Sequence, residues 1–193
     1  MKNAILLHGR PTRDEYYNPS RPSSSNAHWF PWLQKQLIIN DIKADAPEIP
    51  SAFDPQYDLW VKEVERFDIT PETIVVGHSC GAGFWIKYLS LNKDLRVGKV
   101  VLVAPWLGKE YDEPPTNFFE NYTIDPDLLQ RTQGLVILFS DDDHAVIQDA
   151  VEELRQKVKG ASYREFHNYG HFTFESMKTT IFPELLEEVI HAA

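Results

Sequence analysis

The sequence has 193 residues, a length that suits one domain over residues 1–193, and its 19 lysines and arginines against 29 acidic residues give a formal net charge of −10. No basic cluster interrupts this acidic balance, so we expect neither a nucleic-acid partner nor a membrane partner. The first apolar run is too short for a signal peptide, no later run is long enough to cross a bilayer, and a single cysteine cannot form an internal disulfide; these features favour the cytoplasm.

Short apolar runs alternate with helical patterns along the chain. We expect strands at 4–7, 42–49, 73–76, 97–103, 134–139 and 161–166, and helices at 28–38, 56–67, 84–89, 146–158 and 182–190. The residues from Arg10 to Asn26 are rich in proline and serine and are expected to form a long polar loop. This alternation predicts a compact α/β domain, with a mostly parallel, doubly wound sheet of about six strands, helices on both faces and no separate cap domain.

The stretch Gly77-His78-Ser79-Cys80-Gly81 lies between a predicted strand and a helical pattern. Gly-x-Ser-x-Gly at such a place is typical of a nucleophile elbow, a sharp turn that exposes the serine hydroxyl. Ser79 is therefore the predicted nucleophile, and the backbone N–H of Cys80 is a predicted donor to an oxyanion. The second donor is expected in the loop after the first strand, where Gly9 permits close approach and the N–H of Arg10 follows.

A serine nucleophile needs an imidazole base, and the base needs a carboxylate that holds its tautomer. Asp143 and then His171 follow Ser79 along the chain, each after a predicted strand, in the order serine, acid and base. Asp142 is the second choice for the acid, and one of the neighbouring aspartates is expected to cap the following helix. His167 is a weaker candidate for the base because it lies at the end of the predicted last strand.

Other side chains near the strand ends are candidates for contact with a substrate. His8, His78 and Trp106 belong to this group, and the aromatic stretch 111–122, including Phe118, is expected to form one wall of an apolar acyl pocket. Neither the aspartates nor the nearby histidines show the ligand spacing of a zinc site, so we expect no metal and no cofactor.

Several motifs together resemble the retinoblastoma-binding protein 9 family of small serine hydrolases, nearly end to end. They are Gly77-His78-Ser79-Cys80-Gly81-Ala82, His8-Gly9, Trp29-Phe30-Pro31-Trp32-Leu33, Asp142-Asp143 with Val146, and Gly170-His171-Phe172. The resemblance implies a compact α/β-hydrolase domain without the first two antiparallel strands of larger relatives, with the nucleophile at Ser79, the acid at Asp143 and the base at His171.

The chain departs from this family at three points. The loop Arg10 to Asn26 is longer than the family's usual connection, and Ile147 stands where proline commonly follows the valine. The Leu-x-Cys-x-Glu motif for binding the retinoblastoma protein is absent, so that partner is not carried over.

These features predict a serine hydrolase, most simply a carboxylesterase that cleaves small-molecule esters through an acyl-enzyme intermediate. Because a fold does not fix a function, two alternatives stay open: a non-catalytic binding or scaffold protein, and an aminopeptidase-like or acyl-peptide hydrolase. The sequence makes no prediction of the oligomeric state.

Overall fold

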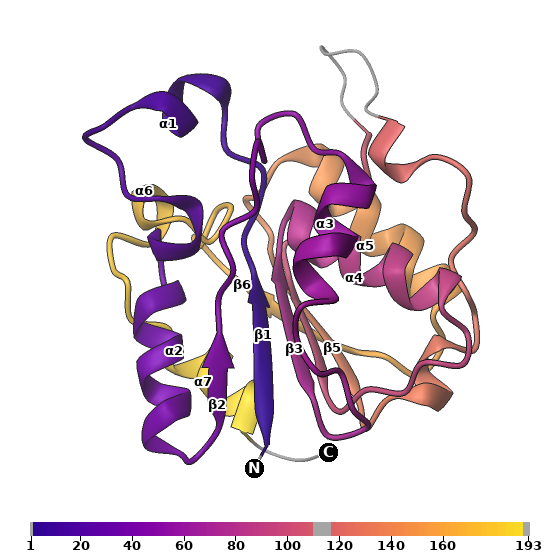
Figure 1. The fold of residues 1–193 in the computed structure, drawn as a ribbon. Helices are drawn as coiled ribbons and strands as arrows, with labels where there is room; N and C mark the ends of the chain where they lie inside the picture. Colours follow the sequence, from indigo (N-terminus) through magenta and orange to yellow (C-terminus); the bar gives the residue numbers. More distant parts are fainter. Residues whose placement is uncertain (1, 110–116, 191–193) are drawn as a thin grey trace.

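The computed structural model describes residues 2–109 and 117–190, and its centre is a six-stranded sheet (Figure 1). The strands run in the order β2-β1-β3-β4-β5-β6, and every neighbouring pair in the described residues is parallel. The six strands are β1 (Asn3–Leu7), β2 (Lys43–Asp45), β3 (Ile74–His78), β4 (Val100–Val103), β5 (Leu135–Ser140) and β6 (Ser162–Phe166). The α/β fold expected from the sequence is confirmed.

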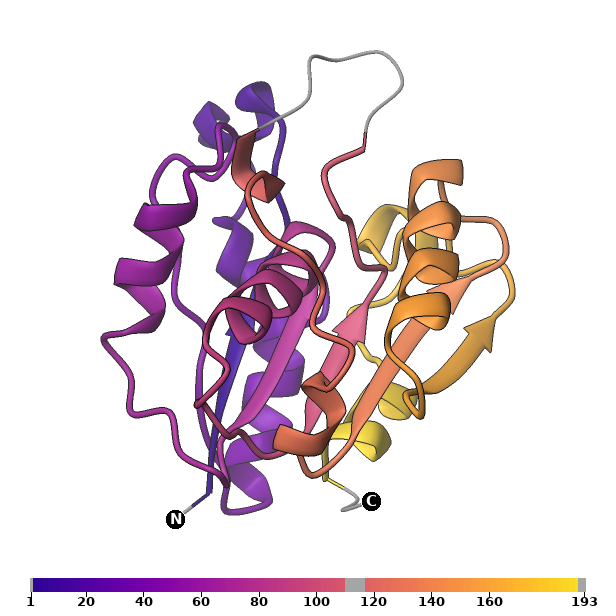
Figure 2. The same cartoon turned by 90° about the vertical axis from the view of Figure 1, so that its right-hand side faces the viewer.

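Helices cover both faces of the sheet, as expected. In Figure 1, α2 and α7 lie on one side of the strands, and α3, α4 and α5 lie on the other side. Figure 2 shows α4 running across the middle of the second face, between α3 and α5. The helices are α1 (Arg13–Tyr17), α2 (Phe30–Ile39), α3 (Tyr57–Val64), α4 (Cys80–Leu91), α5 (Ala145–Lys157), α6 (Phe174–Met177) and α7 (Pro183–Ile190), with short 3-10 turns η1 (Ser24–Asn26), η2 (Asn117–Phe119) and η3 (Leu128–Arg131).

The burial of the strands follows their place in the sheet. Every residue of β3, β4 and β5 is buried, and so is β1 after its first residue, because helices cover these strands on both faces. The edge strands β2 and β6 keep exposed residues. The carboxyl ends of the buried strands meet at one edge of the sheet, and this edge carries the candidate site.

The expected loop from Arg10 to Asn26 contains two short helical elements, α1 and η1. A capping box starts α1: the Thr12 hydroxyl accepts a hydrogen bond from the N–H of Glu15, and the Glu15 carboxylate accepts one from the N–H of Thr12. The expected polar loop therefore contains short helical elements that we did not predict. The sequence does contain a signal for the start of α1, namely the capping-box pattern Thr12-x-x-Glu15.

Some element boundaries also differ from expectation. The strand expected over 42–49 is limited to β2, Lys43–Asp45, because it pairs only with β1 at the edge of the sheet and Pro47 has no N–H to donate. The helix expected from His28 begins at Phe30, with Pro31 in its first turn, where a missing N–H costs no helical hydrogen bond. The short helix α6 was not expected at all.

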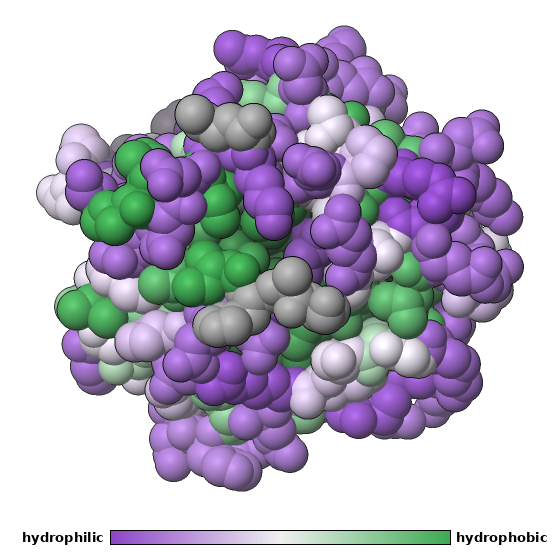
Figure 3. Space-filling model, turned by 90° about the horizontal axis from the view of Figure 1, so that it is seen from below, coloured by the Kyte–Doolittle hydropathy of each residue, from purple (hydrophilic) through white to green (hydrophobic). Residues whose placement is uncertain are grey.

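The opposite end of the molecule, where the strands begin, is shown in Figure 3. Its hydrophobic patches are separated by hydrophilic side chains. Across residues 2–109 and 117–190, no helix has both the length and the apolar character that a membrane crossing needs.

Candidate active site

Ser79 lies at the apex of the turn between β3 and α4 in a conformation that non-glycine residues rarely adopt, with φ 52° and ψ −115°. Such a residue costs on the order of 1–3 kcal/mol and persists only where its surroundings hold it. Here the Ser79 N–H donates to the carbonyl of Val103 at 2.9 Å, and its own carbonyl accepts from Gly83 at 3.0 Å and from Trp106 at 3.1 Å. The chain between β3 and α4 therefore forms the expected sharp elbow.

Two glycines allow the elbow to lie against the end of β1. A Cβ on Gly81 would stand 2.4 Å from the carbonyl oxygen of Leu7, a distance that no side chain tolerates. A Cβ on Gly9 would stand 3.1 Å from the Cβ of Ser79. The loop after β1 thereby lies directly beside the predicted nucleophile, where a second oxyanion donor has to be.

The buried ring of His8 holds the peptide between Gly9 and Arg10. The N–H of Ile49 is 3.0 Å from Nε2 of His8, and because that N–H can only donate, Nε2 must be the acceptor. The proton then sits on Nδ1, which donates to the carbonyl of Gly9 at 2.7 Å. Burial lowers the pKa of His8, which favours this neutral form.

This contact sets the direction of the next N–H. The described peptide bonds are all trans, and in a trans peptide the C=O and the following N–H point in opposite directions. Because His8 holds the carbonyl of Gly9, it also orients the N–H of Arg10, the predicted oxyanion donor. The N–H of Cys80, the other predicted donor, belongs to the first residue of α4, where the helix dipole favours negative charge.

Each of the three consecutive aspartates after β5 has a different partner in the segment that follows β6. Asp141 contacts Nδ1 of His167 at 2.6 Å in an exposed pair. Asp142 accepts from the Ser140 hydroxyl at 2.6 Å and from the N–H of Gly170 at 2.9 Å.

Asp143 pairs with His171, the predicted base. Both carboxylate oxygens of Asp143 lie 3.0 Å from Nδ1 of His171. The Asp143 side chain is fully buried, whereas 21% of the His171 side chain is exposed. Of the two carboxylates left open by the sequence, Asp143 contacts the ring of His171, and Asp142 contacts the backbone of the segment that carries it.

The expectation that one of these aspartates caps the next helix was wrong. α5 begins at Ala145, and its N-cap residue is His144, which makes no capping hydrogen bond through its side chain. The carboxylates are instead engaged with the chain after β6, a contact between residues far apart in sequence. Asp143 also accepts from the N–H of His144 at 2.7 Å.

Ser79 and His171 line one cavity of about 1170 Å³. The wall away from the sheet comes from the segment 10–32 and from α6. It includes the rings of Tyr17 and Phe174, which are 62% and 49% exposed. The carboxylate of Glu175, on α6, forms an ion pair with the guanidinium of Arg21 and so links the two parts of the wall. No group of three metal-ligating side chains occurs in the part of the chain that the structure describes.

Most of the predicted site residues border this cavity. They are His8, Gly9, Arg10, His78, Ser79 and His171. Asp143 lies behind His171. Among the wall residues that the sequence did not indicate are Tyr17 and Phe174, each of which lies on a helix that was not expected.

The predicted acyl-pocket wall from Trp106 and Phe118 was wrong, since neither is among the described residues that border the cavity. Trp106 is 5% exposed, and its indole N–H donates to the carbonyl of Lys109 at 3.0 Å. Phe118 is 1% exposed and packs edge-on against Trp60 in the core. Residues 111–116 of the expected wall lie outside the described residues.

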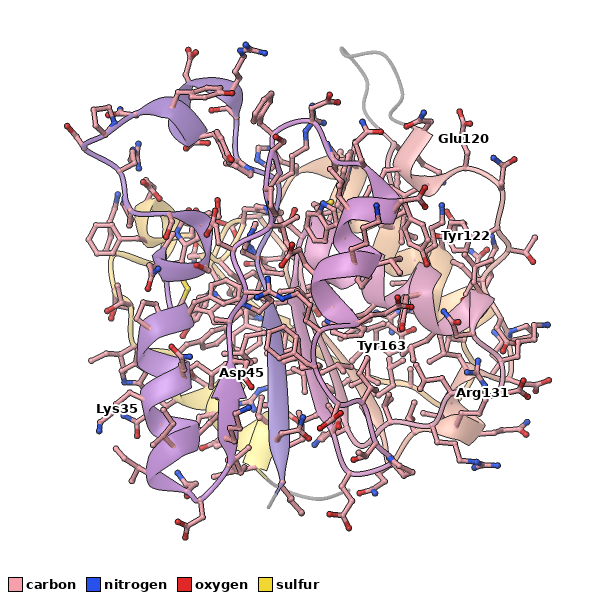
Figure 4. All side chains as sticks on the ribbon, viewed as in Figure 1. Lys35, Asp45, Glu120, Tyr122, Arg131 and Tyr163 are labelled. Carbon is pink, nitrogen blue, oxygen red and sulfur yellow. The ribbon has the colours of Figure 1, made fainter. Side chains whose placement is uncertain are left out.

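The cause of this difference is Lys87 on α4. Its ammonium group donates to the carbonyls of Phe118 at 2.8 Å and Glu120 at 2.9 Å, and lies 4.1 Å from the centre of the Tyr57 ring. Figure 4 labels Glu120 and Tyr122 on this segment, which runs beside α4 on the far side of the molecule from α2. The segment is thus held against the core and turned away from the cavity.

The chain matches one protein-family model and is similar in sequence to a known protein. A family model described as serine hydrolase matches residues 19–186. YdeN of Bacillus subtilis, a protein named as a hydrolase, is 28% identical over 172 residues, which cover 83% of this chain and 86% of YdeN.

Solved structures with the same fold include the ydeN gene product of B. subtilis, with a TM-score of 0.74 and 22% identity over 96% of this chain and 95% of that one. A YdeN-like hydrolase from Pectobacterium atrosepticum has a TM-score of 0.60 and 19% identity, covering 96% of this chain and 87% of its own. Est1E from Butyrivibrio proteoclasticus has a TM-score of 0.62 and 13% identity, covering 98% and 89%.

Proposed function

The chain belongs to the serine hydrolase family, and on that premise we propose that it is a carboxylesterase that cleaves small acyl esters with Ser79, His171 and Asp143 as its catalytic triad. The observation that carries this proposal is the pair of 3.0 Å contacts from Asp143 to Nδ1 of His171, beside a cavity that His171 shares with the strained Ser79. A buried carboxylate on Nδ1 leaves Nε2 as the nitrogen that can accept a proton.

In the proposed reaction, the Ser79 oxygen bonds to the ester carbonyl carbon while Nε2 of His171 accepts the hydroxyl proton. The buried Asp143 stabilises the imidazolium that results, and the N–H groups of Arg10 and Cys80 donate to the tetrahedral oxyanion. When the intermediate collapses, the bond to the alcohol oxygen breaks and His171 gives that oxygen its proton. Water then attacks the acyl-enzyme, again with His171 as base.

The cavity favours esters with an apolar group and no negative charge. Its charged lining residues include three glutamates against two arginines, and the whole chain carries a net charge of −10, so anionic substrates meet an unfavourable field. The exposed faces of Tyr17 and Phe174 offer apolar surface that a substrate would cover. We therefore propose neutral esters of apolar acids or alcohols as the substrate class.

Within the serine hydrolases, we propose that the chain is related to the retinoblastoma-binding protein 9 family. Support comes from the motifs given above and from the sheet, which in the described residues holds parallel strands only, without the two leading antiparallel strands of larger relatives.

Labelling with a fluorophosphonate probe, combined with hydrolysis of nitrophenyl esters, tests the proposed function. We expect the wild type to be labelled, Ser79→Ala to lose labelling, and Ser79→Ala and His171→Ala each to lower kcat by on the order of 10⁴ while remaining folded. Folded wild type that is neither labelled nor active on esters would support the scaffold alternative instead. Cleavage of aminoacyl amides as fast as esters would support the peptidase alternative.

A further inference from the structure

His78 directly precedes Ser79 and has no part in the reaction proposed above. Its ring is only 3% exposed and lies among other rings, with centroid distances of 5.0 Å to His171, 5.8 Å to Trp29 and 6.4 Å to Phe30. A ring so deeply buried offers little surface to a substrate, so the expectation that His78 contacts the substrate does not account for its position. The hydrogen bond that the His78 ring makes explains the position of this ring better.

Nε2 of His78 lies 2.8 Å from the backbone carbonyl oxygen of His171. A carbonyl oxygen can only accept, so Nε2 must carry the proton and donate it. Burial lowers the pKa of His78 well below its ordinary range, and positive charge on His171 and His28 lowers it further. His78 therefore remains neutral even when its neighbour His171 takes up a proton.

The backbone around His171 needs such support because it turns sharply. Asn168, Gly170 and Phe172 all have positive φ, at 62°, 51° and 54°. Two of them are not glycine, so this segment keeps its shape only where other groups hold it.

Several contacts hold the segment around His171, among them the N–H of Tyr169 donating to the Ser140 hydroxyl at 3.1 Å, and three further ones come from three different parts of the chain. Asp142 accepts from the N–H of Gly170 at 2.9 Å, and the indole N–H of Trp29 donates to the carbonyl of Phe172 at 3.1 Å. Only the third contact, the one from His78, reaches the backbone of His171 itself. It is also the only one of the three that comes from the nucleophile elbow, next to Ser79.

We infer that His78 is a positioning residue: by holding the His171 carbonyl, it ties the segment that carries the base to the elbow that carries the nucleophile. Any movement of the elbow is thus shared by the base, which keeps the Ser79 oxygen and the His171 imidazole in register. The inference rests on the proposed function for its effect on rate. The hydrogen bond itself can be tested without activity.

The test compares His78→Leu, which keeps bulk but removes the donor, with His78→Gln, whose amide N–H can reach about the position of Nε2. Phe30→Leu is the matched control, because it removes a buried ring from the same cluster and leaves the hydrogen bond intact. For a nitrophenyl ester, we expect His78→Leu to lower kcat by about 10- to 100-fold with KM changed less than about twofold. His78→Gln should regain much of that loss, and Phe30→Leu should lower Tm while kcat stays within about twofold.

A second readout needs no turnover. We expect the proton on Nδ1 of His171, held by Asp143, to give a downfield NMR signal that broadens or shifts in His78→Leu and remains unchanged in Phe30→Leu. Wild-type kcat and an unchanged signal in His78→Leu would overturn the inference, and so would equal losses of kcat in all three variants. If the wild type proves inactive, the proposed function fails and the NMR signal alone decides whether His78 positions His171.

Discussion

The choice between Asp143 and Asp142 can be decided by exchanging each carboxylate for an amide. In Asp143→Asn the side chain keeps its size but loses its charge, at a position where both oxygens lie 3.0 Å from Nδ1 of His171 and no part of the side chain is exposed. The amide nitrogen facing Nδ1 favours the tautomer with the proton on Nε2, and this tautomer cannot accept the Ser79 proton.

We expect Asp143→Asn to lower kcat by about 10⁴, equivalent to about 5.4 kcal/mol of transition-state stabilisation. In Asp142→Asn the amide oxygen can still accept from the N–H of Gly170, so kcat should fall by no more than about tenfold. Asp141→Asn changes an exposed pair with His167 and serves as the control, with kcat within about twofold of wild type.

The assay is steady-state hydrolysis of a nitrophenyl ester at pH 8, with Tm measured for each variant to verify folding. A larger loss of kcat in Asp142→Asn than in Asp143→Asn would refute this assignment, because it would make the backbone contact more important than the carboxylate on the ring. Equal losses in all three variants would point to a shared structural effect.

Three further predictions follow from the same contacts. His8→Gln keeps an acceptor for the N–H of Ile49 but loses the donor to the Gly9 carbonyl, whereas His8→Asn keeps that donor. With a nitrophenyl ester, we expect kcat to fall by about 10- to 100-fold in His8→Gln and by less in His8→Asn. The reverse order would contradict the role of the hydrogen bond to the Gly9 carbonyl. In Gly83→Ala the new Cβ would stand 2.0 Å from a backbone oxygen, so thermal unfolding should show a loss of about 3 kcal/mol, or about 6–12 °C in Tm; an unchanged Tm would show that the elbow yields easily. Burial lowers the pKa of His8, His28 and His78, so below the ordinary histidine pKa of about 6.5 these side chains bind more protons in the unfolded chain than in the folded one. Tm should therefore fall when the pH is lowered from 7.5 to 5.5. A Tm that does not change over this range would contradict the assignment of buried neutral rings.

The sequence predicted the fold, and it predicted the edge of the sheet at which the candidate site lies, because both depend on local patterns. Alternation of strands and helices implies a parallel sheet, and a parallel sheet brings the carboxyl ends of its strands to one edge. Ser79, Asp143 and His171 were therefore expected near one another although they are far apart along the chain. The structure places each of them just after a strand, at the ends of β3, β5 and β6.

The sequence-based predictions that failed depended on contacts between residues far apart in the chain. The hydrogen bonds from Lys87 to the carbonyl groups of Phe118 and Glu120 hold an aromatic segment against the core, and no local sequence pattern predicts these bonds. The aspartates after β5 read locally as helix caps, but the partners that engage them follow β6. The helix α1 is a different case, because its capping box at Thr12 and Glu15 is a local signal.

The two sides of the cavity are held by interactions of different strength, and this difference bears on how the enzyme would select substrates. Ser79, Asp143 and His171 are held by hydrogen bonds from several elements, and displacing the fully buried Asp143 side chain would leave polar groups unpaired. The opposite wall is joined by the ion pair of Arg21 with Glu175, whose side chains are 46% and 51% exposed, and by an exposed hydrogen bond from the N–H of Phe174 to Nδ1 of His28 at 3.0 Å; contacts so exposed contribute little to stability. Water can replace the partners in both contacts, so the wall can shift at smaller cost than the proposed reacting groups. Differences in the size of accepted esters should therefore arise from the segment 10–32 and α6, and differences in rate from the ends of the strands.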